Sequence, residues 1–131
     1  MKKILVLLLL VALGCTKEDV VQQETQLIIN PIDRCVNGFA GNYPCKDYDL
    51  LAHVTLEEMA GENTSGNDSW GWVDQATQKE YALMCTNKGV SFIDITNPET
   101  VTIVGFLETR TENSLWRDVK IYNNVAYIVS E

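Results

Sequence analysis

The sequence predicts an all-β fold for most of this 131-residue chain, and three observations lead to that prediction. Short runs rich in Val, Ile, Tyr and Trp follow one another from residue 67 onward. Turn-forming residues such as Asn87-Lys88-Gly89 and Asn97-Pro98-Glu99 separate these runs at short intervals. A spaced pattern of Asn, Trp and Tyr then occurs twice along the chain.

The N-terminus has the pattern of an exported lipoprotein. Met1-Lys2-Lys3 is basic, and the apolar run Ile4–Leu13 is too short to span a membrane as a stable helix. We therefore expect residues 1–14 to be a lipoprotein signal peptide. Ala12-Leu13-Gly14 before Cys15 resembles a bacterial lipobox, which implies cleavage before Cys15 and acyl chains on that cysteine. An ordinary signal peptide followed by an accidental cysteine is the alternative.

The residues after Cys15 bear on where the protein is displayed. Thr16-Lys17-Glu18-Asp19 resembles the export signal of Bacteroidetes surface lipoproteins, in which acidic residues closely follow the lipidated cysteine. We expect the protein to be lipid-anchored in the outer membrane and exposed on the cell surface, with residues 15–34 as the tether. Leu27–Ile29 within the tether is a short apolar patch that can lay one strand on the domain. A plain polar tether is the alternative.

The charge of the chain limits its partners. The formal net charge is −8, and removal of the signal peptide would make the product more acidic. Nucleic acid is therefore not expected as a partner, because its phosphates require a basic surface. Attachment to the membrane would come from acyl chains on Cys15 rather than from electrostatic attraction.

A cysteine-bracketed segment, residues 35–66, follows the tether. Cys35 and Cys45 enclose a loop rich in Gly and Asn, and two cysteines at this spacing in an exported protein usually form a disulfide. A metal site would need further Cys or His ligands, and His53 is the only histidine in the chain. We therefore expect a disulfide between Cys35 and Cys45.

The predicted strands follow one another as hairpins. Alternating apolar and polar residues in Leu50–Leu56 predict a half-buried strand, and Glu57–Gly66 a polar loop. The further expected strands are Ser69–Asp74, Glu80–Thr86, Val90–Thr96, Val101–Glu108, Asp118–Tyr122 and Val125–Ser130. Asn123-Asn124 suits a two-residue turn with positive φ. Four sequential antiparallel strands joined by short turns form a meander, which is the unit of a propeller blade.

A sequence repeat supports the blade interpretation. The tetrapeptide NDSW at 67–70 is followed roughly 46 residues later by NSLW at 113–116, and Tyr81 and Tyr127 are separated by the same interval. Repeats of about 40–50 residues are typical of propeller blades. The second copy holds only its first two strands. We therefore expect residues 67–131 to be an incomplete β-propeller, one four-stranded blade plus the first hairpin of the next, at the front of a longer protein.

These motifs resemble a known family. Residues 67–131 resemble the opening of the choice-of-anchor B family of bacterial surface proteins, and CVNGFAGNYPCKDYDLLAHVTLEEM at 35–59 is similar to that family's N-terminal segment. GVSFIDITNP at 89–98 resembles the LVIVD repeat, a propeller-blade motif. The resemblance implies several further blades and, here, an anchor at Cys15. It implies no catalytic residue.

Residue types that commonly act in catalysis or bind metal ions are few in this segment. His53 is expected to face solvent, and Cys85, in the apolar run YALMCT, is expected to be a buried and inert thiol. The acidic residues Asp68, Asp74, Asp94 and Asp118 fall at strand ends or turns, and no calcium-loop pattern surrounds them. We therefore expect no catalytic residue, no metal site and no cofactor.

The tryptophans are the candidate ligand-facing residues. Trp70, Trp72 and Trp116 either pack between blades, which their large buried area favours, or line the mouth of the central channel. In the second case they would face a ligand. The sequence thus predicts a surface module for binding or adhesion to an extracellular ligand or partner protein. The alternative is an exported propeller-type hydrolase or lyase whose active residues lie in blades outside this chain.

Overall fold

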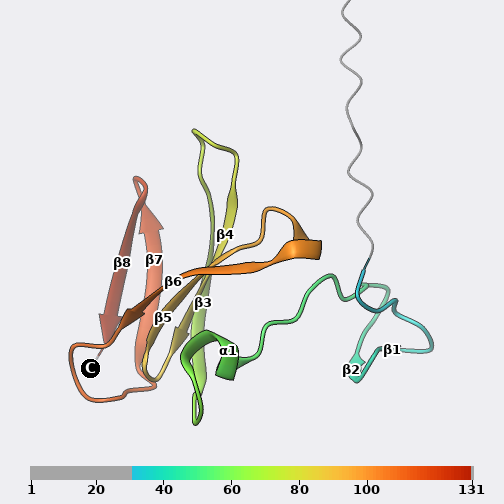
Figure 1. The fold of residues 1–131 in the computed structure, drawn as a ribbon, viewed down its shortest axis with the longest axis horizontal. Coiled ribbons are helices and arrows are strands. Elements are labelled where there is room, and N and C mark those ends of the chain that lie inside the picture. The colour runs from blue at the N-terminus through green and yellow to red at the C-terminus, as the bar shows by residue number, and fades with distance from the viewer. Residues whose placement is uncertain (1–30, 131) are drawn as a thin grey trace, which may run out of the picture.

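The computed structural model describes residues 31–130 and is built mainly of antiparallel strands (Figure 1). The predicted signal peptide, the lipidation site Cys15, most of the tether and Glu131 lie outside the described residues. Within them, the strands form one four-stranded and two two-stranded sheets, with one short α-helix and one 3-10 turn. The predicted all-β class is confirmed.

The central sheet is a meander with the strand order β3-β4-β5-β6. Its strands are β3 (Gly66–Val73), β4 (Glu80–Thr86), β5 (Gly89–Asp94) and β6 (Thr102–Glu108). Local polar contacts hold the turns: the Asp74 carboxylate accepts from the backbone N–H of Ala76 at 3.0 Å. Asn97 caps the 3-10 turn η1 (Pro98–Thr100) that leads into β6. The predicted four-strand meander is therefore confirmed.

Glycine at position 89 is required by the close approach of β5 and β6. A Cβ atom on Gly89 would collide with the backbone carbonyl of Leu107 and with the ring of Phe106. The first residue of β5 therefore has to be glycine for β6 to pair at this register, in which Gly89 lies opposite Glu108.

The last two strands form a separate hairpin, β7 (Arg117–Tyr122) and β8 (Val125–Ser130). Asn123 and Asn124 make the predicted two-residue turn, with φ angles of 48° and 60°. In Figure 1 this β7–β8 hairpin stands at the left of the central sheet. It makes most of its contacts with β3 and β4, through β7.

The hydrophobic core lies between the hairpin and the central sheet. Val119 of β7 is buried against Leu83, Cys85 and Val90 of the sheet. These three sheet residues share one face, because Leu83 and Cys85 alternate along β4 and Val90 lies opposite Cys85. The predicted burial of Cys85 is confirmed, and its thiol is free.

The N-terminal segment contains a disulfide and a very short hairpin. Cys35 and Cys45 are bonded, with their Cα atoms 5.9 Å apart, as predicted. The hairpin strands are β1 (Phe39–Ala40) and β2 (Tyr43–Pro44). In Figure 1 this segment lies at the right, on the opposite side of the molecule from the β7–β8 hairpin.

The predicted strand Leu50–Leu56 is wrong. Leu50 makes only an isolated bridge to Asp33, and Leu56 already begins the helix α1 (Leu56–Ala60). Alternation does persist, because Ala52 and Val54 are half-buried while their neighbours are exposed. The alternating pattern therefore indicates a segment with one half-buried and one exposed side, but no neighbouring strand among the described residues pairs with this segment.

The predicted polar loop Glu57–Gly66 is also wrong at its start, because a capping box forms α1. The Thr55 side chain accepts from the Glu58 N–H at 3.2 Å, and the Glu58 carboxylate accepts from the Thr55 N–H at 2.7 Å. The Met59 carbonyl accepts from the hydroxyl of Ser91 at 3.0 Å. Ser91 alternates with Val90 along β5, so α1 covers the face of the sheet opposite the hairpin.

The two copies of the Asn, Trp and Tyr pattern do not occupy equivalent places. Tyr81 pairs with Trp72 across β3 and β4, whereas Tyr127 pairs with Lys120 across β7 and β8. Trp116 precedes β7 instead of lying within it. The cause is the connecting turn, which covers residues 74–79 in the first hairpin and only residues 123–124 in the second.

Candidate functional site

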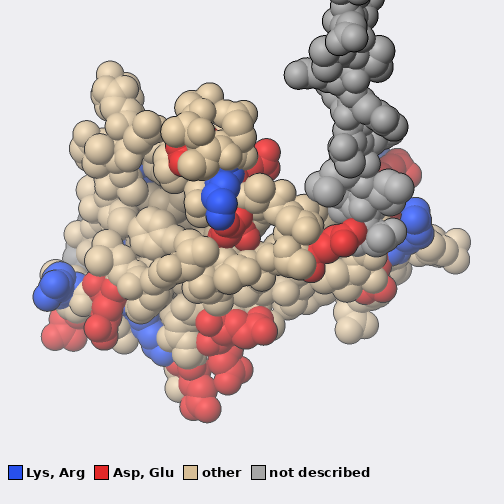
Figure 2. All heavy atoms as spheres, turned by 45° about the horizontal axis from the view of Figure 1, so that its top comes forward, with Lys and Arg blue, Asp and Glu red and all other residues tan. Residues whose placement is uncertain are grey.

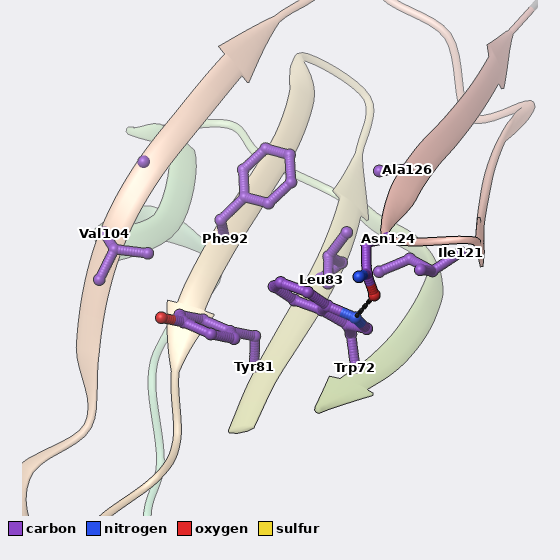
Figure 3. Close-up of a pocket in the computed structure, with 9 residues that line it drawn as sticks. Trp72, Tyr81, Leu83, Phe92, Val104, Ile121, Asn124 and Ala126 are labelled. Carbon is purple, nitrogen blue, oxygen red and sulfur yellow. Dashed lines mark hydrogen bonds between the residues drawn. The ribbon is translucent and has the colours of Figure 1, made fainter. Parts of the chain in front are cut away.

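An apolar cleft opens between the central sheet and the β7–β8 hairpin (Figure 3). Its volume is about 420 Å³. The residues that line it are Trp72, Tyr81, Leu83, Phe92, Val104, Gly105, Ile121, Asn124 and Ala126. A concave, mostly apolar surface with few polar groups is the usual form of a ligand site. We call this feature the Trp72 cleft.

Strand alternation brings the aromatic side chains of the Trp72 cleft together. Trp72 lies opposite Tyr81, and Leu83 lies opposite Phe92, so their side chains share the face of the sheet that the hairpin approaches. The rings of Trp72 and Tyr81 stack at a centroid distance of 5.3 Å and an angle of 23°. Such offset aromatic pairs are favourable beyond the area that they bury.

A hydrogen bond from the indole ring of Trp72 to the hairpin fixes the position of the ring. Trp72 Nε1 donates to Asn124 Oδ1 at 3.3 Å, and Figure 3 shows the Asn124 side chain reaching the indole from the turn. The backbone of Asn124 has positive φ, a conformation that Asn tolerates better than most residues. The same residue thus closes the β7–β8 turn and orients Trp72.

The Trp72 cleft is open because the hairpin covers only part of the sheet. The hairpin packs on β3 and β4, while the outer strand β6 leaves Val104 54% and Leu107 50% exposed. The result is an apolar floor with a stacked aromatic pair at one end and one amide above it. This arrangement suits a flat apolar or aromatic group.

Trp70 has a structural role at the joint between sheet and hairpin. Lys120 Nζ of β7 lies 4.7 Å from the Trp70 ring centroid and 2.8 Å from the Asp68 carboxylate. Asp68 also accepts from the Val119 N–H at 3.1 Å. The hydrogen bond with Lys120, followed by that from Val119, lowers the pKa of Asp68, and the bond with Asp68 raises the pKa of Lys120.

Trp116 lies apart from the other two tryptophans. It is 73% exposed and precedes β7, where its backbone N–H is bonded to the Ser114 hydroxyl at 3.0 Å. Of the three tryptophans that the sequence offered, the structure places only Trp72 in the cleft. Asn124 and Ile121 were not singled out as candidate site residues. The Asn123-Asn124 pair predicts a turn, and this pattern does not indicate a role in the cleft.

The titratable residues of the described part of the chain do not gather into a reactive cluster. His53 is exposed and its Nε2 lies 3.0 Å from the Tyr43 hydroxyl, in the N-terminal segment. Burial raises the pKa of the Cys85 thiol to about 11. Within residues 31–130, no three His, Cys, Asp or Glu side chains lie close enough together to hold a metal ion.

On the face in Figure 2, acidic side chains outnumber basic ones, and the basic ones lie singly rather than in a continuous patch. None of the helices within this part of the chain is long and apolar enough to cross a membrane.

Comparisons of this chain with protein-family models, with curated proteins and with solved structures find no match.

Proposed function

We propose that this protein is a lipid-anchored cell-surface protein that binds an extracellular ligand or partner in the Trp72 cleft. The cleft carries the binding part of the proposal, because it combines an apolar floor with an indole held by both stacking and a hydrogen bond. A ring fixed in this way offers a contact surface with little conformational entropy left to lose on binding.

The anchor and the architecture belong to the same proposal. The sequence around Cys15 supports lipidation and display, and the four-strand meander with a hairpin on one face is the arrangement that a propeller blade and the start of its neighbour would have. Membership of the choice-of-anchor B family would account for both features. The N-terminal disulfide fits an oxidising extracytoplasmic location.

Display on the surface is tested in intact cells. Metabolic labelling with an alkynyl fatty acid is expected to mark the wild-type protein and not the Cys15→Ser variant. Replacement of Lys17, Glu18 and Asp19 by alanine is expected to preserve labelling and to reduce cleavage by added protease. Labelling of the Cys15→Ser variant would overturn the anchor, and unchanged cleavage would overturn the export signal.

Binding in the Trp72 cleft is tested with a simple aromatic probe. We expect 5-fluoroindole, followed by ¹⁹F NMR, to bind the purified full chain saturably, and Trp72→Leu to weaken binding about tenfold through lost ring stacking. Trp116→Leu is the matched control, because Trp116 is exposed outside the cleft. Equal effects of the two substitutions, or binding that does not saturate, would refute a site in the cleft.

A further inference from the structure

The segment that leads into α1, green in Figure 1, has the alternation of a strand but no partner strand among residues 31–130. Leu50, Ala52 and Val54 are half-buried, whereas the residues between them are exposed. The segment is paired only at Leu50, through an isolated antiparallel bridge to Asp33. The backbone groups of Ala52 and Val54 form no hydrogen bond with any described residue. A half-buried segment with unpaired N–H and C=O groups favours the addition of a strand.

The bridge between Asp33 and Leu50 fixes the register in which such a strand would add. The Asp33 N–H donates to the Leu50 carbonyl at 3.2 Å, and the Leu50 N–H donates to the Asp33 carbonyl at 2.9 Å. The two residues therefore form a hydrogen-bonded antiparallel pair. Each step back along the chain from Asp33 faces one step forward from Leu50. This register places Ile29 opposite Val54, again in a hydrogen-bonded pair, because such pairs alternate along the ladder.

The exposure of the residues next to the bridge agrees with this register. Ile32 and its partner Leu51 are both exposed, and Pro31 and its partner Ala52 are both half-buried. Facing residues of an antiparallel pair share one side of the sheet, so the two segments alternate in step. Pro31 has no N–H to donate, so the ladder loses a bond at this pair. Ile29 is the next residue that can form both bonds.

A cavity of about 400 Å³ lies beside the same segment. Its apolar lining consists of Ile32, Ala52, Val54, Pro98, Val101 and Ile103, and four polar residues complete it. Ile32 already lies at this cavity, and three extended residues span about 10 Å, so Ile29 is within reach of it. The side that Ala52 and Val54 turn to the cavity is also the side that Ile29 would share.

We propose that residues 27–30 of this chain form the missing strand, pair with the segment before α1 and place the Ile29 side chain in this cavity. Leu27–Ile29 is the longest apolar run of the predicted tether, and it directly precedes the described residues. Alternation turns Leu27 and Ile29 toward the cavity and Ile28 and Asn30 toward solvent. The strand adds to a segment that precedes the meander, so it leaves the β8 edge to the next strand of the proposed propeller.

This docking determines from which side the tether reaches the domain. Ile103 of the cavity pairs with Ile93, which alternates along β5 with Ser91 beneath α1. The cavity therefore lies on the face of the sheet opposite the Trp72 cleft. The inference rests on the proposed lipid anchor only for its consequence. The free tether would be limited to residues 15–26, which span at most about 40 Å, and the cleft would remain clear of it.

Disulfide trapping in the full chain tests the register. Asn30 lies opposite His53 in a non-hydrogen-bonded pair, whose Cα atoms are about 4.5 Å apart, within the range of a disulfide. Asn30 and Leu51 are diagonal neighbours about 7–8 Å apart, and Leu51 is exposed, so this pair is the matched control. We expect Asn30→Cys with His53→Cys to cross-link at least about tenfold faster than Asn30→Cys with Leu51→Cys.

Peptide mapping without reduction measures the cross-link, because in both variants it joins the tryptic peptides 18–34 and 47–79. Equal rates for the two variants, or no cross-link in either, would overturn the proposal. A cross-link between two copies of the chain would assign the cavity to a second molecule and would also overturn docking within one chain.

Hydrogen exchange provides a second measurement, on the backbone. Ile29→Ser removes the side chain from the cavity, so the Val54 amide is expected to exchange at least about tenfold faster than in the wild type. Ile28→Ser is the matched control, because Ile28 faces solvent, and it should leave this rate nearly unchanged. The His53 amide points away from the added strand and should respond to neither substitution. Equal effects of the two substitutions on Val54 would contradict the proposed faces.

The cross-link and the protection of Val54 are expected to persist in the Cys15→Ser variant, because docking needs only residues 27–30. Loss of fatty-acid labelling with retention of the cross-link would therefore leave this inference standing. Retained labelling of the wild type without any cross-link would overturn the docking and leave the proposed anchor intact.

Discussion

Removal of two methyl groups at Val119 tests whether the β7–β8 hairpin is held by its inner face. Val119 is 1% exposed and packs against Leu83, Cys85 and Val90. Its truncation to alanine loses about 1.6 kcal/mol of transfer free energy, at about 0.8 kcal/mol for each carbon. The cavity left behind adds to this, so we expect Val119→Ala to lower the free energy of unfolding by about 2–3 kcal/mol.

Urea unfolding followed by tryptophan fluorescence measures this effect, since Trp72 lies at the hairpin and sheet interface. With a typical dependence on urea, the midpoint is expected to fall by about 1 M. Val129→Ala is the matched control, because Val129 lies in the same hairpin but is 64% exposed. It is expected to change stability by less than about 0.5 kcal/mol. Similar losses for both variants would show that the hairpin does not pack through Val119.

Three further predictions concern the disulfide, Asp94 and Cys85. Reduction of the Cys35–Cys45 bond, whose cysteines are 10 residues apart, should lower stability by about 2–3 kcal/mol in urea titrations; an unchanged midpoint would show that this segment unfolds independently. Hydrogen bonds from Thr96 and Lys79 lower the pKa of Asp94 to about 2 in the folded protein. The ionised carboxylate therefore stabilises the fold fully above the pKa of about 3.9 that Asp has in the unfolded chain, and this stabilisation is lost as the pH falls through about 2. Asp94→Asn should therefore lower the free energy of unfolding at pH 5 and hardly change it at pH 2. A difference between variant and wild type that is the same at both pH values would contradict this. Cys85, with a pKa of about 11, should react with Ellman's reagent only in denaturant, whereas rapid labelling of the native chain would show that it is accessible.

The strands could be predicted from the sequence because their turns have strong local signals. Asn123-Asn124 and Asn97-Pro98 fix where strands end, and the structure adds or removes only one or two residues at most boundaries, with β3 beginning three residues early. The prediction of a strand in the segment before the sheet failed for a different reason. Alternation in Leu50–Leu56 needs a neighbouring strand to become β-structure, whereas the Thr55 and Glu58 capping box is a local signal that suffices for a helical turn.

The site was harder to predict because the sequence of β8 does not say which of its faces is buried. In β7 the outward residues Asp118 and Lys120 are charged. In β8, Ala126 and Ile128 turn inward, but the outward residues Val125, Tyr127 and Val129 are equally apolar. Alternation identifies a buried face only when the other face is polar. The cleft depends on that choice of face. Trp70 and Trp72, in contrast, share one face of β3 and differ in position along the strand, because Lys120 of β7 lies over the Trp70 ring.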